Sequence, residues 1–284
     1  MSVRILTDSV ADLPPGIARG LGIEVVPLLV RFGDEEYRDG VDITTEQFYR
    51  MLQERREFPA TATPSPATFA EAYDRLAAEA DELLVITLSA RLSGTFQAAL
   101  QGRELMSGRR RVEVLDSGTA TMTQGFVVMR AAEAARAGSS LEGALEAARR
   151  AAARVNILCT FDTLEYLRRG GRIGAAAAFL GSLLKVNPLL TLRDGVVLPA
   201  GRTRSRAAAV DRLYEYVAGY ERIEELAVEH TACPEEAEAL LARLAALHPR
   251  ERIHLSKMTP VIGTHTGPGL LLVGVLGDRK PGPA

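Results

Sequence analysis

The feature that most constrains this chain is the recurrence of short apolar runs that end in polar turns. Such runs, typical of buried strands, lie at 3–8, 23–30, 83–88 and 112–117. Helices are expected behind them at 14–20, 46–54, 67–79, 94–107, 121–137 and 141–154. Strands that alternate with helices favour a parallel sheet covered by helices on both faces. In such a sheet the loops beyond the carboxyl ends of the strands form the ligand site.

The pattern changes after about residue 155. Strands are expected at 156–161, 224–230, 252–256 and 270–276, and helices at 207–219 and 234–246. Residues 187–192 and 196–198 are predicted to pair as a hairpin through an Asp194-Gly195 turn. Residues 175–184 are almost wholly apolar, so a helix there must be buried or line a cavity. This half therefore predicts a mixed α/β domain.

Length, charge and cysteine content limit the classes of protein to consider. At 284 residues the chain is long for one core, and we expect an α/β protein with two domains, residues 1–155 and 156–284. The net charge of −2 argues against general nucleic-acid binding. Cys159 and Cys233 are too isolated for a disulfide framework or a Cys-x-x-Cys metal site. Because neither a signal-peptide core nor a run of about 18 apolar residues occurs, we expect a cytoplasmic protein without an integral membrane segment.

The most informative strand end is the stretch LVITLSARLSGTFQAAL at residues 84–100. Its apolar strand is followed by Ser93, Gly94 and Thr95, and then by the start of a helix. This arrangement places two hydroxyls and a flexible glycine where the free backbone N–H groups of a helix point outward. Such a helix start accepts a carboxylate or a phosphate. The alternative is that Ser93 or Thr95 only caps the helix.

Three further stretches have no obvious role in a core and are expected to be loops. They are TATPSP at 61–66, RRGGRI at 168–173 and GTHTGPG at 263–269. The prolines of the first stretch exclude a continuous helix. His265 lies at the centre of the last stretch, and a histidine is suited to donate a hydrogen bond to an anion. A plain loop histidine is the alternative.

Motifs along nearly the whole chain, from about residue 3 to 277, occur in the order found in the DegV family, which the chain therefore resembles. They are ILTDSVADLPP, TATPSP, LSARLSGTFQAA, VEVLDSGTATMTQG, TLEYLRRGGRIG, GRTRSR and VIGTHTGPGLLLVG. The family comprises bacterial fatty-acid-binding proteins, typified by the FakB carriers. These hold a fatty acid while a separate dihydroxyacetone-kinase-like partner phosphorylates its carboxylate to an acyl phosphate for phospholipid synthesis. The resemblance implies a Rossmann-like amino-terminal domain, a smaller mixed-sheet carboxyl-terminal domain and an apolar ligand tunnel between them.

The resemblance also implies which residues bind the ligand. The carboxylate would be bound by Thr61, Ser93, Gly94, Thr95 and His265. The acyl phosphate or the kinase would be contacted by Arg172, Arg202 and Arg204. The acyl tunnel would be lined by Ile157, Phe161, Leu164, Ile173, Phe179, Leu183, Leu184, Leu189 and Ile262, for which ordinary core packing is the alternative. One departure is Ala62-Thr63, where many relatives have serine and glutamine, and it leaves the other contacts of this loop open.

The physical chemistry agrees with this interpretation. Hydroxyls and helix-end amides bind a carboxylate without a buried cation, and one carboxylate oxygen stays available for phosphorylation. Burial of the tail contributes about 0.8 kcal/mol per methylene, so the tunnel should set affinity. We therefore expect a monomeric carrier that is not itself an enzyme. Its expected ligand is a fatty acid such as palmitate or stearate, and its expected partner is the kinase, with no metal, other cofactor or nucleic acid.

Rival functions have weaker support in the sequence. A hydrolase or acyltransferase acting on a lipid would use Ser93 as nucleophile and His265 as base, but Leu92-Ser93-Gly94 is not a Gly-x-Ser-x-Gly elbow. Asp8 and Asp116 could pair around Mg²⁺ at neighbouring strand ends. The simpler interpretation is that both aspartates brace turns by accepting nearby N–H groups.

Overall fold

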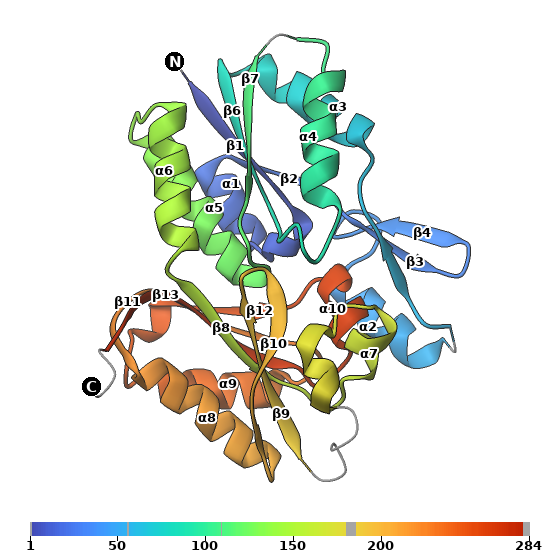
Figure 1. Cartoon of the computed structure of the whole chain (residues 1–284), viewed down its shortest axis with the longest axis vertical. Coiled ribbons are helices and arrows are strands. Elements are labelled where there is room, and N and C mark those ends of the chain that lie inside the picture. The colour runs from blue at the N-terminus through green and yellow to red at the C-terminus, as the bar shows by residue number, and fades with distance from the viewer. Residues whose placement is uncertain (1, 56, 109, 180–185, 281–284) are drawn as a thin grey trace. The chain divides into compact units, whose positions relative to one another are not determined.

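The computed structural model describes residues 2–55, 57–108, 110–179 and 186–280 (Figure 1). The chain forms two compact units. The first unit contains residues 1–153 together with Thr259–Val261, and the second contains residues 154–258 and 262–284. A short segment from late in the sequence therefore belongs to the first unit.

A four-stranded parallel sheet forms the centre of the first unit, as the alternation of strands and helices predicts. Its strand order is β2-β1-β6-β7, formed by β1 (Val3–Asp8), β2 (Ile23–Val26), β6 (Glu82–Thr87) and β7 (Arg111–Asp116). Each neighbouring pair runs parallel. The carboxyl ends of β1 and β6 are almost fully buried, because helices cover both faces of the sheet.

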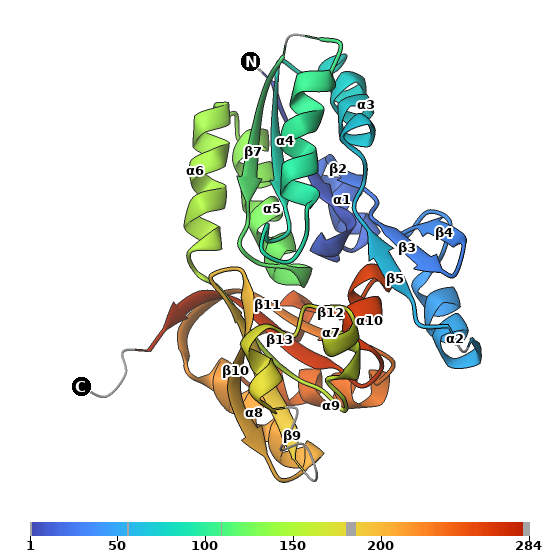
Figure 2. The ribbon, with the colours of Figure 1, turned by 45° about the vertical axis from the view of Figure 1, so that its right-hand side comes forward.

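The helices of the first unit form a layer on each face of this sheet (Figures 1 and 2). One layer consists of α3 (Pro66–Ala77) and α4 (Thr95–Leu105), whose Phe69, Tyr73 and Ala99 pack on the sheet with Val85. The other consists of α1 (Pro15–Leu21), α5 (Thr121–Arg136) and α6 (Leu141–Ala152). A 3-10 turn, η1 (Ser9–Ala11), joins β1 to α1. The predicted α/β fold class is confirmed here.

A small antiparallel sheet corrects one expected strand of the first unit. The strand predicted over 23–30 is two strands, because β2 ends at Val26 and β3 (Leu29–Phe32) begins after Pro27, which has no N–H for a ladder. β3 is the middle strand of a sheet with β4 (Glu35–Arg38) and β5 (Ala60–Ala62). The helix α2 (Thr45–Glu54) lies between β4 and β5 in the chain and begins with a Thr44–Gln47 capping box. TATPSP is thus partly a strand.

The second unit is built on a six-stranded mixed sheet, which confirms the predicted fold class for this half. The strand order is β10-β9-β8-β13-β11-β12. The strands are β8 (Val155–Thr160), β9 (Asn187–Arg193), β10 (Val196–Thr203), β11 (Tyr220–His230), β12 (Ile253–Lys257) and β13 (Leu271–Arg279). Only β11 and β12 pair in parallel among these described strands. β9 and β10 form the predicted hairpin, with Asp194 and Gly195 at positive φ.

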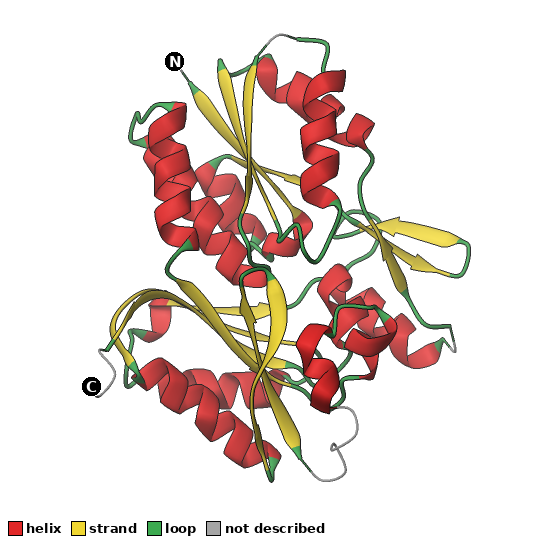
Figure 3. Cartoon of the chain, viewed as in Figure 1, coloured by secondary structure: helices red, strands yellow, loops and turns green. Residues whose placement is uncertain are grey.

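The two faces of the mixed sheet carry different elements (Figure 3). One face packs against the long helices α8 (Arg206–Ala218) and α9 (Pro234–Leu244). The other carries shorter pieces, namely α7 (Glu165–Arg169), the 3-10 helix η2 (Gly174–Phe179) and α10 (Pro260–Thr266). A further 3-10 turn, η3 (Arg250–Arg252), precedes β12. Alternate residues of β13 reach opposite faces: Val273 packs with the long helices and Leu272 with the short ones.

Two of the short pieces differ from what the sequence favours. The described part of the apolar stretch, Gly174–Phe179, is a 3-10 helix, and although Ala176 is buried, Ala175 and Ala177 are exposed. Residues 180–184 of the predicted helix lie outside the described residues, so its burial or its place in a cavity wall stays a prediction. The glycine-rich stretch around His265 is not a loop throughout, because residues 260–266 form α10.

Candidate functional site

The hydroxyls predicted to bind a carboxylate lie together at the start of α4. Ser93 Oγ and Thr95 Oγ1 are 2.9 Å apart, and the Thr95 N–H donates to Ser93 Oγ at 3.3 Å. The N-cap residue is Gly94, which has no side chain to cap the helix, and Ser93 Oγ accepts the first helical N–H, that of Thr95. Ser93 is half-buried, Gly94 is exposed and Thr95 is buried. The first turn of α4 thus offers a partly accessible hydroxyl beside backbone N–H groups, an arrangement that suits an anion.

A second pair of hydroxyls lies in β5 and directly after it, at Thr61 and Thr63. Thr61 lies opposite Val30 of β3 and is half-buried. Thr63 is exposed, and a Cβ placed on Gly94 would lie 3.7 Å from Thr63 Oγ1. The structure therefore places the Thr63 hydroxyl next to the α4 start. The sequence had marked this position only as a departure from the usual family pattern.

The loop that leads into α4 is braced by the aspartates at the strand ends. Asp116 Oδ1 accepts the N–H groups of Ala90 and Gly118, at 3.1 and 2.8 Å. Asp8 accepts the N–H groups of Val10 and Leu88, at 3.0 and 2.8 Å. Among the described residues, no group of three or more histidine, cysteine or acidic side chains is arranged to hold a metal ion. These contacts agree with turn bracing.

His265 lies in the second unit, on α10, beside the turn that follows α7. A Cβ on Gly170 would overlap His265 Nδ1 and lie 3.1 Å from its Cε1, so the imidazole packs directly on this glycine. Arg172 Nη1 donates to the Gly170 carbonyl oxygen at 2.6 Å. Burial, and then the charge of Arg172, lowers the pKa of His265 to about 4. The imidazole is therefore neutral near pH 7, and one of its nitrogens carries a hydrogen for donation.

The same turn is fixed by a second close approach. Gly267, at φ +67, leaves no room for a Cβ because the Tyr166 ring occupies that space. Glu165 accepts from Arg168 at 2.7 Å and from Arg169 at 2.5 Å. The Tyr166 ring therefore packs α7 against the end of α10, and the Arg172 guanidinium bonds to the same turn and acts on His265 through its charge.

The other two predicted arginines lie elsewhere in the second unit. Arg202 is on β10 and Arg204 follows it, and both are exposed. Within the part of the chain that the structure describes, neither forms an ion pair, whereas Arg206 pairs with Glu236 at 2.7 Å. Arg202 and Arg204 are thus available to an external anion, while Arg172 bonds inward.

Most predicted tunnel residues gather in one apolar cluster on the α7–α10 face of the mixed sheet. The predicted residues found in this cluster are Ile157, Phe161, Leu164, Ile173, Phe179 and Ile262. Leu189 packs instead on the α8–α9 face. Successive side chains of a strand point to opposite faces, and on β9 it is the neighbouring Leu190 that belongs to the apolar cluster. Leu183 and Leu184 lie outside the described residues.

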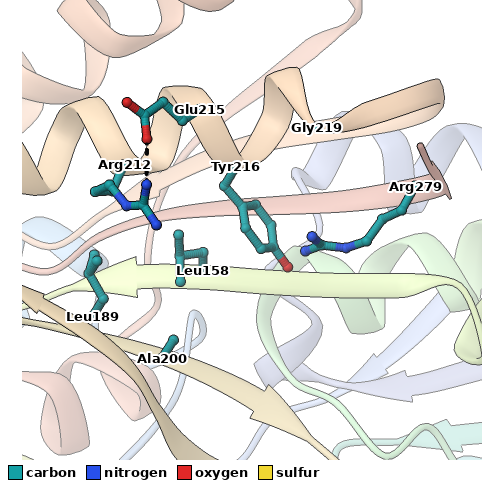
Figure 4. A pocket seen from close by; sticks show the side chains of 8 residues that line it. All are labelled: Leu158, Leu189, Ala200, Arg212, Glu215, Tyr216, Gly219 and Arg279. Atoms are coloured by element: carbon teal, nitrogen blue, oxygen red, sulfur yellow. Dashed lines mark hydrogen bonds and ion pairs between the residues drawn. The ribbon is translucent and has the colours of Figure 1, made fainter. Parts of the chain in front are cut away.

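A cavity of about 270 Å³ lies on the α8 face, between that helix and strands β8 to β10 (Figure 4). It is lined by Leu158, Leu189, Ala200, Arg212, Glu215, Tyr216, Gly219 and Arg279. Arg212 pairs with Glu215 at 2.7 Å, and the Arg279 guanidinium lies 4.2 Å from the centre of the Tyr216 ring. This cavity is on the opposite face of the sheet from the apolar cluster that contains Ile262.

No helix in the described ranges combines the length and apolar character needed to cross a membrane. A sequence model described as "Uncharacterised protein, DegV family" matches residues 2–278. A DegV domain-containing protein of Streptomyces coelicolor is 42% identical over 274 residues, which cover 95% of this chain and 96% of the relative.

Solved structures of the same family superpose closely. A structure described as fatty acid binding of a DegV family protein from Thermus thermophilus has a TM-score of 0.89 and 36% identity, covering 98% of this chain and all of that one (100%). The Bacillus subtilis protein described as DegV, a fatty acid binding protein, has a TM-score of 0.87 and 30% identity, with coverage of 98% and 100%. The match over nearly the whole chain, in sequence and in structure, establishes that this protein belongs to the DegV family.

Proposed function

We propose that this protein binds a long-chain fatty acid and presents it to a separate fatty acid kinase, which phosphorylates the carboxylate. The observation that carries the proposal is the hydroxyl pair of Ser93 and Thr95 at the start of α4, where the N-cap residue is a glycine with no capping side chain. It occurs in a chain whose relatives from Thermus thermophilus and Bacillus subtilis are described as fatty acid binding.

In this proposal the carboxylate is bound by Thr61, Ser93 and His265, with the N–H groups at the start of α4. A hydrogen bond from a neutral donor to a carboxylate contributes about 1.5–3 kcal/mol. A neutral imidazole can donate one such bond, which fits the low pKa of His265. Because no fixed cation neutralises the carboxylate in this scheme, one oxygen keeps its nucleophilic character for the kinase.

The acyl chain is proposed to lie against the apolar cluster of the second unit, which includes Ile157, Phe161 and Ile262. Each buried methylene contributes about 0.8 kcal/mol, so a chain of roughly sixteen carbons gains on the order of 10 kcal/mol before ordering costs. Leu189 is left out of the proposed wall because it packs on the other face of the sheet.

Kinase docking is proposed for Arg202 and Arg204. Their exposure and lack of ion-pair partners within the described ranges suit an acidic partner surface or a phosphate. Arg172 is assigned instead to the imidazole turn, since it bonds to Gly170. The carrier is proposed to act as a cytoplasmic monomer.

The hydrolase alternative gains no support from the surroundings of His265. The cation beside it and its burial lower its pKa to about 4, which makes it a weak general base near pH 7. A serine nucleophile needs a base that is both close and oriented by an acceptor. Binding without catalysis therefore suits these residues better.

Mass spectrometry of an organic extract of the purified protein tests the proposal directly. A long-chain fatty acid at near-stoichiometric amount is expected. Ser93→Ala should lower fatty-acid affinity about 10-fold or more, through the lost hydrogen bond. Ser140→Ala removes a serine that caps α6 far along the chain, and it should leave affinity unchanged. Hydrolysis of chromogenic esters that Ser93→Ala abolishes would favour the hydrolase instead.

A further inference from the structure

The chain passes between the two units inside α10. Thr259–Val261 belong to the first unit, whereas Ile262 and the residues after it belong to the second. α10 spans Pro260–Thr266, so one short helix has its first turn in the first unit and carries His265 in its last turn. Contacts that hold Thr259–Val261 in place therefore also hold the first turn of α10, the helix that bears His265.

Side chains from two distant parts of the first unit hold this segment. Asp12 Oδ1 accepts the Thr259 N–H at 3.0 Å. The Thr259 side chain and the Val261 amide both lower the pKa of the Asp39 carboxyl, which places them beside it, and Asp39 Oδ2 accepts from Ser9 Oγ at 2.8 Å. Asp12 has a left-handed backbone, with φ 49° and ψ 25°, which is uncommon for a residue other than glycine. Such strain persists where surrounding contacts require it.

The carboxyls in this region are almost completely buried. The exposed fractions are 0% for Asp8, 4% for Asp12 and 3% for Asp39. Burial and, to a smaller degree, the charge of Asp8 raise the pKa of Asp39 to about 7. Burial likewise raises the pKa of Asp8 to about 6. The groups that face these two carboxyls are uncharged donors, including Gln124 of α5, and no cation is among the described groups that shift their pKa values.

Asp39 Oδ1 and Thr259 Oγ1 are buried, and within the described part of the chain neither makes a hydrogen bond of normal geometry. A protonated Asp39 could donate from Oδ1 to the Thr259 hydroxyl, which would satisfy both atoms. An ionised Asp39 would instead place an uncompensated charge at the base of α10.

We propose that Asp39 and Asp12 are positioning residues that clamp the first turn of α10, and that Asp39 does so in its protonated form. The clamp fixes the helix that carries His265 and thereby tunes fatty-acid binding. The effect on fatty-acid binding rests on the proposed function, whereas the clamp itself does not.

Hydrogen exchange of the ligand-free protein, read on peptides covering residues 258–266, tests the clamp. We expect Asp39→Ala to raise exchange in these peptides at least 10-fold at pH 6. In the wild type, exchange there should rise between pH 6 and pH 8.5 beyond the change in intrinsic rate, and Asp39→Asn should abolish that excess. Exchange in Asp39→Ala equal to the wild type, or an identical pH profile in Asp39→Asn, would overturn the clamp.

Fatty-acid affinity, measured on the same variants, separates the clamp from its functional role. Asp39→Ala should bind at least 5-fold more weakly at pH 6, and Asp39→Asn should restore binding because the amide keeps the hydrogen-bonding shape. Ser140→Ala, which weakens the α6 cap, controls for general destabilisation and should change neither readout. Raised exchange with unchanged affinity would refute the positioning role while leaving the clamp. Failure of the wild type to bind any fatty acid would refute the proposed function alone.

Discussion

Gly170→Ala is the most direct test of the role proposed for His265, because it moves the imidazole without altering it. Gly170 has φ −73° and ψ −5°, a conformation that alanine adopts freely. Its Cβ would nevertheless overlap His265 Nδ1 and lie 3.1 Å from the backbone oxygen of Tyr166. The added methyl group therefore acts through contact and not through backbone strain.

The magnitude follows from three effects. Overpacking costs about 1–3 kcal/mol, and the reduced entropy of the unfolded chain returns about 0.4–1 kcal/mol, so a net loss of stability of roughly 0–2.5 kcal/mol is expected. Displacement of His265 removes one hydrogen bond to a charged group, worth about 1.5–3 kcal/mol. Fatty-acid affinity should thus fall roughly 10- to 100-fold.

Isothermal titration calorimetry with oleate, combined with thermal unfolding, measures both quantities. Gly16→Ala is the matched control, since no atom lies within 4 Å of the added Cβ, and it should not affect affinity. In a His265→Ala background the effect of Gly170→Ala on affinity should vanish, because the two changes act through one contact. A folded Gly170→Ala protein with the affinity of the wild type would refute the role of His265.

Further predictions concern stability and docking. The pKa of Asp39 is about 7 in the folded protein against 3.8 unfolded, so its contribution to stability falls as pH rises from about 4 to 7. Asp39→Asn should remove this fall, a gain of about 4 kcal/mol at pH 8 in urea unfolding, and an unchanged pH profile would contradict the assignment. Gly102→Ala should destabilise the first unit by about 1–3 kcal/mol in the same assay, because its Cβ would lie 2.6 Å from Phe69 Cβ and 2.8 Å from a backbone oxygen. Full stability would show that α3 and α4 can separate at little cost. Arg202→Ala should leave fatty-acid affinity unchanged while slowing acyl phosphate formation with the kinase, and loss of affinity would assign Arg202 to the binding site.

Local signals in the sequence were sufficient for most of the secondary structure. The period of apolar residues and the chemistry of turns act over a few neighbouring residues, so the parallel strands, the long helices and the Asp194-Gly195 hairpin could all be predicted. The break at Pro27 could also have been found, because proline cannot donate to a ladder. The hydroxyls at the start of α4 were predicted for the same local reason.

The stretch around His265 could not be predicted locally. Gly263, Thr264 and Thr266 are weak helix formers, so the sequence favours a loop there. The structure forms α10 because its first residues are held by the first unit and Ile262 packs in the apolar cluster of the second. Tertiary contacts override propensity at such a position.

By itself, the sequence determined the order of strands and helices, the family, and the hydroxyl-rich helix start, since each depends on residues adjacent in the chain. Only the tertiary structure decided that Leu189 faces away from the other predicted tunnel residues, that Thr63 lies beside Gly94, and that Thr259 meets Asp12 from far along the chain. Burial and proximity between distant segments are properties of the packed fold. The pKa values of Asp39 and His265 depend on burial and on neighbouring charges, and for that reason no local pattern revealed them.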